Sequence, residues 1–401
     1  MKALEIVPMT EHEILDRVRT ESDSAVRASG IVRACRVALP GEPFAALQRY
    51  LRVPSLKVRL AVLVCLARET SEHNAQALKD QLAQMTSELE EASEQWKDVA
   101  EALGEIRHPA TVDLHIRLLR HQNLQVRKEA IRSAARSQQR ELVPFLVRLL
   151  ADRDLGAEAR RALQEWGPRI LGTMSDILRD PGEDIEIRRS IPLVLAYVPS
   201  QATADLLLEC LFDYDGLLRY RAIRAVGKLH AIDPDLRIDP ERVGLCIRED
   251  CGKTLGYQQA LACLYPKGDS SDFLALLLND KINYGRERVF RLLGLILPKR
   301  DAYACFVATK EEDRLKKAHV AEYLENVLPA TLKESVLAFV EAKIKESREA
   351  DDVARILETF MKSPDPILRD CVMDAIAKGR WPGVSRTTPT LRQLEEGFSH
   401  G

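Results

Sequence analysis

A short pattern recurs along this chain and constrains its fold more than any other feature. An acidic or small polar residue is followed three positions later by an aliphatic residue, then usually by arginine, and then by a small or aliphatic residue, as in "NLQVRKEAIR" from Asn123. The aliphatic positions are Val26, Val58, Val126, Leu155, Ile187, Leu218 and Leu368, with Gly285 at the same place in a looser copy. Most neighbouring copies lie 29–32 residues apart or at about twice that step. Such a period predicts a stack of similar structural units.

Each repeating unit is expected to contain two helices. Amphipathic stretches such as "ELVPFLVRLL", "ADLLLECLF" and "DFLALLLND" precede most copies, with apolar residues at helical spacing. A unit is therefore a first helix, a short turn and a second helix that carries the motif. Two helices of this size cannot bury their apolar faces alone, whereas stacked neighbours share a continuous core. The sequence predicts an all-α fold, a right-handed α-solenoid.

The motif residues have separate physical roles. The Asp, Asn or Ser at the first position suits the N-cap of the second helix, where its side-chain oxygen accepts from an otherwise unpaired backbone N–H. The aliphatic residue is expected to enter the core. The arginine that follows leaves the first turn of the helix within reach of cap carboxylates, which predicts a ladder of Asp and Arg side chains along the stack.

The pattern D-x-x-(V/L/I)-R-x-x-A after an "LL" helix resembles the HEAT-repeat family over residues 10–380. In the second half, "LRYRAIRAVGKL", "DPDLR", "RERVFRLLGLI" and "EYLENVLP" resemble the soluble HEAT extension of some bacterial membrane proteins of the ATP/ADP translocase-like, major-facilitator type. That second resemblance implies a detached regulatory and interaction module. It carries over no transport residue, because the membrane segments that would contain one are missing from this sequence.

Five segments are expected along the chain. They are N-terminal HEAT-like repeats over 1–70, an irregular long-helix repeat over 71–106, central HEAT repeats over 107–300, C-terminal helical repeats over 301–380 and a flexible tail over 381–401 that holds a short docking helix. In the irregular repeat, Leu78, Leu82, Met85 and Leu89 share one helix face, which favours packing against the stack.

Composition argues against catalysis, cofactors and membrane insertion. The formal net charge is −2, no apolar run is long enough to span a bilayer, and the first twenty residues are too charged for a secretory signal. No phosphate-binding, hydrolase or kinase motif occurs. The eight cysteines have no zinc-like spacing and are expected to be buried reduced thiols. We expect a cytoplasmic protein that is not an enzyme, with no cofactor and no metal.

Positive charge is concentrated on the second helices, although the chain as a whole is slightly acidic. In solenoids of this family these helices line the concave face, so the pattern predicts a basic groove for an acidic partner. The candidate residues are Arg132, Arg136, Arg160, Arg161, Arg189, Arg221, Arg224, Lys228, Arg288 and Arg291. The alternative is that these are ordinary solvated helix faces and that the cap carboxylates neutralise part of the charge.

The leading functional hypothesis is a non-catalytic scaffold that binds a protein partner, one that is acidic or attached to a membrane transporter. A HEAT-like DNA-binding protein or DNA glycosylase is the alternative, and it requires an aromatic residue beside a carboxylate in the groove; Trp166 with Glu165 is the nearest match. A HEAT-like bilin lyase is a third hypothesis, for which the sequence offers no chromophore-handling motif.

Overall fold

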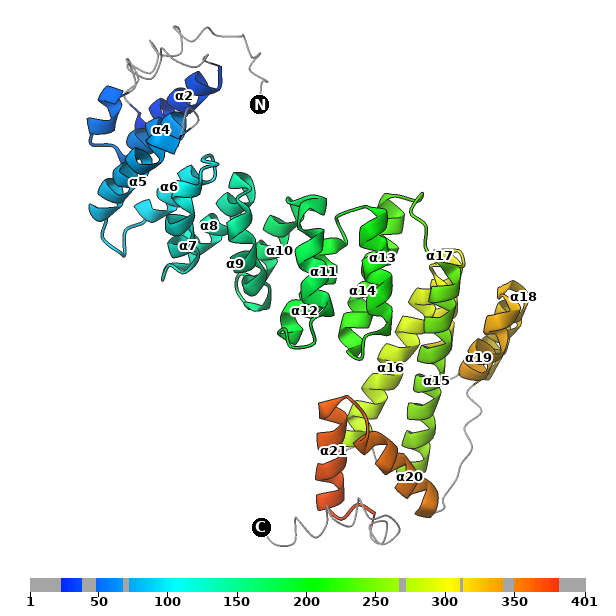
Figure 1. Ribbon diagram of the computed structural model, residues 1–401. Helices are drawn as coiled ribbons and strands as arrows, with labels where there is room; N and C mark the ends of the chain where they lie inside the picture. Colours follow the sequence, from blue (N-terminus) through cyan, green and yellow to red (C-terminus); the bar gives the residue numbers. More distant parts are fainter. Residues whose placement is uncertain are drawn as a thin grey trace. The chain divides into compact units, whose positions relative to one another are not determined.

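The computed structural model describes residues 23–37, 48–67, 72–266, 272–310, 313–341 and 350–381 (Figure 1). Within these ranges the secondary structure consists of α-helices and short 3₁₀ helices (η), with no strand. The all-α prediction is therefore confirmed. The chain divides into two compact units, Met1–Val194 and Leu195–Gly401. The expected docking helix in the tail lies outside the described residues.

Unit 1 is built of short helices. They are α2 (Ser24–Val37), η1 (Gln48–Arg52), α4 (Leu56–Leu66), α5 (Glu72–Ser87), α6 (Gln95–Leu103), η3 (Pro109–Thr111), α7 (Val112–Leu119), α8 (Leu124–Ser137), η4 (Arg140–Leu142), α9 (Val143–Arg148), η5 (Leu149–Ala151), α10 (Gly156–Gln164), η6 (Gly167–Ile170), α11 (Leu171–Arg179) and α12 (Ile185–Leu195). α7 packs against α8 and α9 packs against α10, and α8 also contacts the second helices before and after it, α6 and α10. This stacking of helical hairpins is the solenoid that the repeat predicts.

Unit 2 contains longer helices. They are α13 (Gln201–Glu209), η7 (Cys210–Phe212), α14 (Gly216–Ile232), α15 (Pro240–Leu264), α16 (Phe273–Leu293), α17 (Lys299–Lys310), α18 (Arg314–Val327), α19 (Ala330–Glu341), α20 (Ala350–Met361) and α21 (Pro366–Ala377). α15 and α16 pack together along their length. The sequence predicted a turn between "DFLALLLND" and "GRERVFRLLGLI", and that prediction is wrong, because α16 runs through both. No proline interrupts residues 273–293, and Gly285 alone does not break a helix that packs on α15.

The cap residues of the motif act as expected, with one exception. Their side-chain oxygens accept a hydrogen bond from the backbone N–H two or three residues later at Asp23, Asn123, Asp184, Asp215 and Asp365. Ser55 precedes α4 with extended backbone but accepts no such bond. The cap chemistry thus fixes where most of the motif helices begin.

The aliphatic motif positions are buried at Val58, Val126, Leu155, Ile187, Leu218 and Leu368. Val26 is the exception and is 56% exposed, which corrects the prediction that it enters the core. The buried side of α2 is centred on Ile31. Val26 lies five residues earlier, about 140° around the helix, and so points away from that core.

Two of the motif arginines, Arg127 and Arg188, bind a carbonyl at the end of the preceding helix. The Nε atom of Arg127 donates to the carbonyl oxygen of Leu119 at 3.2 Å, at the end of α7. Arg188 donates to the carbonyl oxygen of Leu178 at 2.9 Å, near the end of α11. The last carbonyls of a helix have no partner within it, so this side chain satisfies an otherwise open acceptor. One rung of the expected ladder is present as well, because Arg127 Nη2 lies 3.3 Å from Asp152 Oδ2.

The irregular repeat has the helices that its sequence predicts, a long α5 followed by the shorter α6. Leu78, Leu82 and Met85 are buried, which agrees with packing of this face. Leu89 is corrected, because α5 ends at Ser87 and Leu89 lies beyond it, only partly buried. Among the residues that the structure describes, six cysteines are free and five of these are buried, whereas Cys65 is disulfide-bonded. The expectation of reduced thiols throughout is therefore wrong at Cys65.

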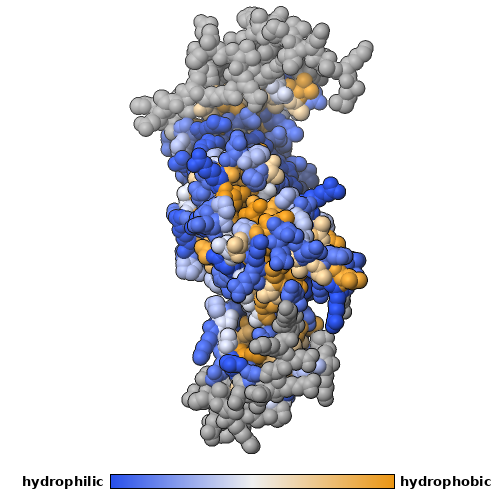
Figure 2. Space-filling view, turned by 90° about the vertical axis from the view of Figure 1, so that its right-hand side faces the viewer, coloured by the Kyte–Doolittle hydropathy of each residue, from blue (hydrophilic) through white to orange (hydrophobic). Residues whose placement is uncertain are grey.

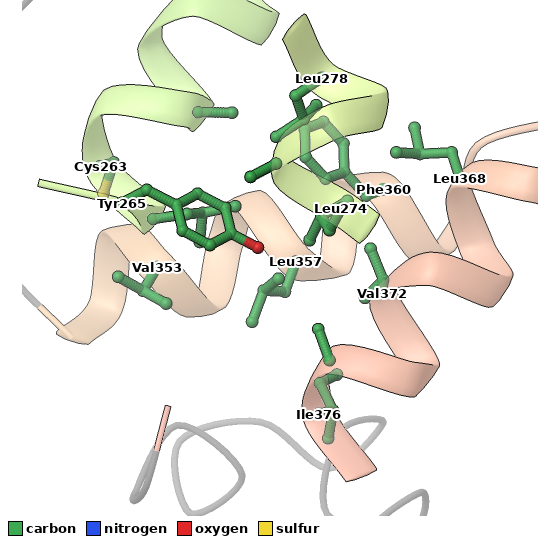
Figure 3. Close-up of a cluster of buried hydrophobic side chains, with 14 of the residues drawn as sticks. Cys263, Tyr265, Leu274, Leu278, Val353, Leu357, Phe360, Leu368, Val372 and Ile376 are labelled. Carbon is green, nitrogen blue, oxygen red and sulfur yellow. The ribbon is translucent and has the colours of Figure 1, made fainter. Parts of the chain in front are cut away.

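The apolar core of unit 2 gathers where α15, α16, α20 and α21 meet (Figure 3). Tyr265 follows α15, Leu274 belongs to α16, Leu357 and Phe360 come from α20, and Val372 comes from α21. Apolar residues also reach the surface, where Figure 2 shows them as a band among hydrophilic ones. Among the described helices, none is both long enough and apolar enough to cross a bilayer.

Candidate partner-binding surface

α14 separates its apolar and basic residues onto different sides. Asp215 caps it by accepting from the backbone N–H of Leu218 at 2.7 Å. Its buried face comprises Leu218, Ala222, Ala225, Val226 and Leu229. Arg224 is exposed, and Lys228 and Arg221 are partly exposed.

Tyr220 is the centre of a small cluster of cations. Its hydroxyl donates to Glu287 Oε1 at 2.9 Å, which ties α14 to α16. The guanidinium carbon of Arg224 lies 5.7 Å from the centre of its ring, and that of Arg291 lies 5.4 Å from it. Both distances are within the roughly 6 Å over which a cation is attracted to an aromatic face. The tyrosine thus holds two arginines on one surface.

Lys228 makes a second contact of this kind. Its Nζ atom lies 3.5 Å from the centre of the Tyr197 ring. A hydrogen bond from Lys228 and its positive charge lower the pKa of the Tyr197 hydroxyl below its ordinary value. Tyr197 is 53% exposed, so this pair is accessible from solvent.

Glu287 offsets part of the positive charge. Burial raises the pKa of Glu287, but hydrogen bonds from Arg291 and Tyr220, together with the charges of Arg291 and Lys310, hold it below its ordinary value. The carboxylate is therefore ionised at neutral pH. We call Tyr197, Tyr220, Arg224, Lys228, Glu287 and Arg291 the basic–aromatic surface. Its members carry three positive charges and one negative charge.

The candidates on α8 and α10 have a different environment. Arg132 Nη2 lies 2.6 Å from Glu158, and Arg161 Nη1 lies 2.9 Å from the same carboxylate. Arg136 Nη2 lies 2.9 Å from Glu129, which also pairs with Arg132. Three cations therefore share two carboxylates in a network, and little positive charge is left over.

The remaining candidates are dispersed. Arg189 pairs with Glu186 at 2.5 Å, and Arg160 is partly exposed with no ion pair to any described residue. Arg288 is only 5% exposed, and its Nε and Nη2 atoms donate to the Asp250 carboxylate at 3.1–3.3 Å. The prediction that Arg288 contributes to a binding surface is corrected here, because its guanidinium is used inside the core.

The aromatic residue that the glycosylase alternative needs is buried. Trp166 is 1% exposed and packs in unit 1, so it presents no face on which a base could stack. Among the described residues, no three His, Cys, Asp or Glu side chains come together as a metal site. His115 is also buried, and its Nε2 atom lies 3.2 Å from the carbonyl oxygen of Ala130.

Sequence reasoning found the cations of the basic–aromatic surface but missed its tyrosines and Glu287. Two signals were present. Tyr220 precedes Arg224 by four residues, the spacing at which helical side chains meet. Tyr197 precedes Lys228 by 31 residues, which is one repeat period, so the two occupy equivalent places in successive helical repeats.

The helical hairpins and their stacked second helices define the class, an α-solenoid of the HEAT type. A family model described as HEAT repeats matches residues 97–165, the segment that holds α6 to α10. No curated protein matches the chain. The resemblance of the second half to the translocase-like extension stays a prediction. The basic–aromatic surface lies outside the matched residues.

Proposed function

We propose that the chain is a non-catalytic interaction module, and that the basic–aromatic surface binds an acidic segment of a protein partner. The observation that carries the proposal is the way its cations are held. Arg224 and Lys228 lie against tyrosine rings. Glu287, the one carboxylate of the surface, pairs with Arg291 instead. A guanidinium or ammonium on an aromatic face keeps N–H groups for an incoming carboxylate.

The HEAT-type fold supports an interaction role, because stacked helical repeats offer extended surfaces to partners. The exposed tyrosine and arginine content also fits a protein interface, where both residue types are enriched. Attachment to a membrane transporter, and a cytoplasmic location, remain predictions from the sequence. They would determine where the acidic partner lies but not how this surface recognises it.

The test is a titration of the full-length chain against a fluorescent polyglutamate peptide, with a neutral peptide and a random DNA duplex in parallel. The Arg224→Glu, Lys228→Glu double variant should bind polyglutamate at least roughly tenfold more weakly, because each reversal replaces an attraction of about 1 kcal/mol by a repulsion. Binding by the unaltered chain should weaken as salt is added.

A matched control is the Lys299→Glu, Arg300→Glu variant, which makes the same change in net charge at exposed residues of α17. It should bind like the unaltered chain. Equal losses in the two variants would show that net charge alone matters and would reject this surface. Tighter binding to the DNA duplex than to polyglutamate would favour the nucleic-acid alternative instead.

A further inference from the structure

Unit 2 has a cavity away from the basic–aromatic surface. It has a volume of about 580 Å³ and lies between α15 and α20. Its lining residues are Lys253, Gly256, Tyr257, Gln259, Ala260, Cys263, Asp352, Arg355, Ile356, Thr359, Phe360, Ser363 and Leu368. Several of these, including Phe360 and Leu368, also belong to the apolar core drawn in Figure 3. The cavity is therefore an apolar extension of the core that opens to solvent, of the size at which proteins bind ligands.

Charge does not select the occupant of this cavity. Lys253 pairs with Glu249 on its own helix, and Arg355 pairs with Asp352 on its own helix. The rim cations are thus already neutralised by nearby carboxylates. The apolar side chains of the wall must provide the recognition, which points to an occupant with large apolar groups at a spacing that fits between two helices.

The described chain ends beside the same core. Trp381, the last described residue, packs on it, and its Nε1 atom donates to the carbonyl oxygen of Leu264 at 3.3 Å. Its ring lies 6.0 Å from that of Tyr265, at an angle of 72°. Leu264 directly follows Cys263, which lines the cavity. Trp381 therefore contacts the residue that directly follows the cavity lining on α15.

The sequence after Trp381 contains one apolar segment, "LRQLEEGF", over 391–398. Leu391, Leu394 and Phe398 are spaced by three and four residues and would share one face of a helix. The other undescribed segments close in sequence to the cavity walls are polar or charged, "KGDSS" at 267–271 and "AKIKESRE" at 342–349. We propose that residues 391–398 dock in the cavity as a short amphipathic helix, with Leu391, Leu394 and Phe398 toward its apolar wall.

The connecting chain is long enough for this contact. The ten residues from Trp381 to Leu391 span up to about 33 Å when extended. The wall of α15 from Lys253 to Cys263 is only about 15 Å long, at 1.5 Å per residue. A tether of this length also gives an effective concentration in the millimolar range, which favours the chain's own segment over that of a second copy.

Photocrosslinking in the full-length chain tests the docking directly. A benzophenone amino acid is introduced at Leu394, the chain is irradiated at submicromolar concentration, and crosslinked peptides are mapped by mass spectrometry. The expected crosslinks join residue 394 to peptides that contain residues 253–263 or 352–363 of the same chain. The control places the same probe at Arg392, on the opposite face of the helix, where the yield should be severalfold lower.

Two cavity variants make the test specific. Ile356→Asp puts a charge on the apolar wall, and Thr359→Trp fills the cavity from an exposed position that tolerates a larger side chain. Either should reduce the crosslink from residue 394 severalfold. An unchanged yield in a folded variant would overturn the proposal, as would equal yields from positions 392 and 394. Crosslinks between isotopically labelled and unlabelled copies would show that a second copy occupies the cavity instead, and no crosslink at all would mean that the segment does not dock.

Discussion

Replacing Asp250 by asparagine should destabilise unit 2 by about 3–5 kcal/mol. Asp250 is 2% exposed and lies between Arg219 and Arg288, which are also buried. Its carboxylate oxygens are 3.1 Å from Arg288 Nε and 3.6 Å from Arg219 Nη2. At an effective dielectric constant of about 20, each contact corresponds to about 5 kcal/mol of Coulomb attraction. Desolvation of the three charges offsets much of this gain, but removing the carboxylate leaves two buried cations without their counter-charge.

Thermal unfolding of the full-length chain, followed by far-UV circular dichroism, measures this loss. For a unit of about 200 residues, a loss of 3–5 kcal/mol lowers the Tm of its transition by roughly 6–20 °C. Glu249→Gln is the matched control, since it removes the adjacent carboxylate, which is exposed and paired with Lys253. That change should cost less than about 1 kcal/mol.

A combined variant separates charge from packing. Asp250→Asn together with Arg288→Met removes one of the two stranded cations and replaces it with an apolar side chain of similar length. This double variant should be more stable than Asp250→Asn alone. A Tm shift for Asp250→Asn no larger than that for Glu249→Gln would contradict this role of Asp250. So would a double variant in which Arg288→Met adds its own full loss of stability.

Three further predictions concern individual positions. Burial, with a contribution from Arg136, lowers the pKa of His115 from 6.5 to about 4. The unfolded chain therefore takes up the proton first as the pH falls. Lowering the pH from about 7.5 to about 5 should reduce the free energy of unfolding of the unaltered chain by about 2 kcal/mol more than that of His115→Asn, as measured by urea unfolding at both pH values. Gly285→Ala would bring a Cβ into steric conflict with Thr254 Oγ1 and should cost about 1–3 kcal/mol in thermal unfolding, partly recovered by Thr254→Ala. Gly252→Ala meets no atom within 4 Å and should be neutral or stabilising in the same measurement. Burial raises the pKa of the Cys246 thiol to about 12, so iodoacetamide at about pH 8 should label it only after unfolding; native labelling as fast as that of the half-buried Cys371 would contradict this.

The repeat was enough to predict the fold because its physical roles are local. A cap such as Asn123 satisfies a backbone N–H two residues away, and an aliphatic residue three positions after the cap faces the core. Where local rules compete, the sequence was less informative. Nothing in "DFLALLLNDKINYGRERVF" marks whether one helix or two will form, and the answer depends on the length of α15 against which α16 packs.

The candidate site was predictable only in part, because charge counting treats every basic residue alike. Arg288 and Arg291 lie three residues apart on α16, yet one is buried and the other exposed. The difference comes from Asp250, 38 residues before Arg288, which accepts from it in the core. Only the packing of α15 on α16 brings that carboxylate to one arginine and not to the other. Burial of Trp166 is likewise a property of the assembled stack.

Whether a basic side chain is paired with a carboxylate or lies on an aromatic ring affects how readily an acidic ligand can bind it. An acidic ligand that approaches Arg132 or Arg161 has to displace Glu158, so one ion pair is exchanged for another and the net gain is small. A ligand that approaches Arg224 or Lys228 meets a cation held on a tyrosine ring, and a carboxylate can bind its N–H groups while the ring contact persists. The affinity for an acidic ligand is therefore expected to depend less on the number of basic residues along the second helices than on the few that lie against an aromatic ring. If the proposed function holds, we therefore expect an acidic partner to bind α14 and α16 rather than α8 and α10.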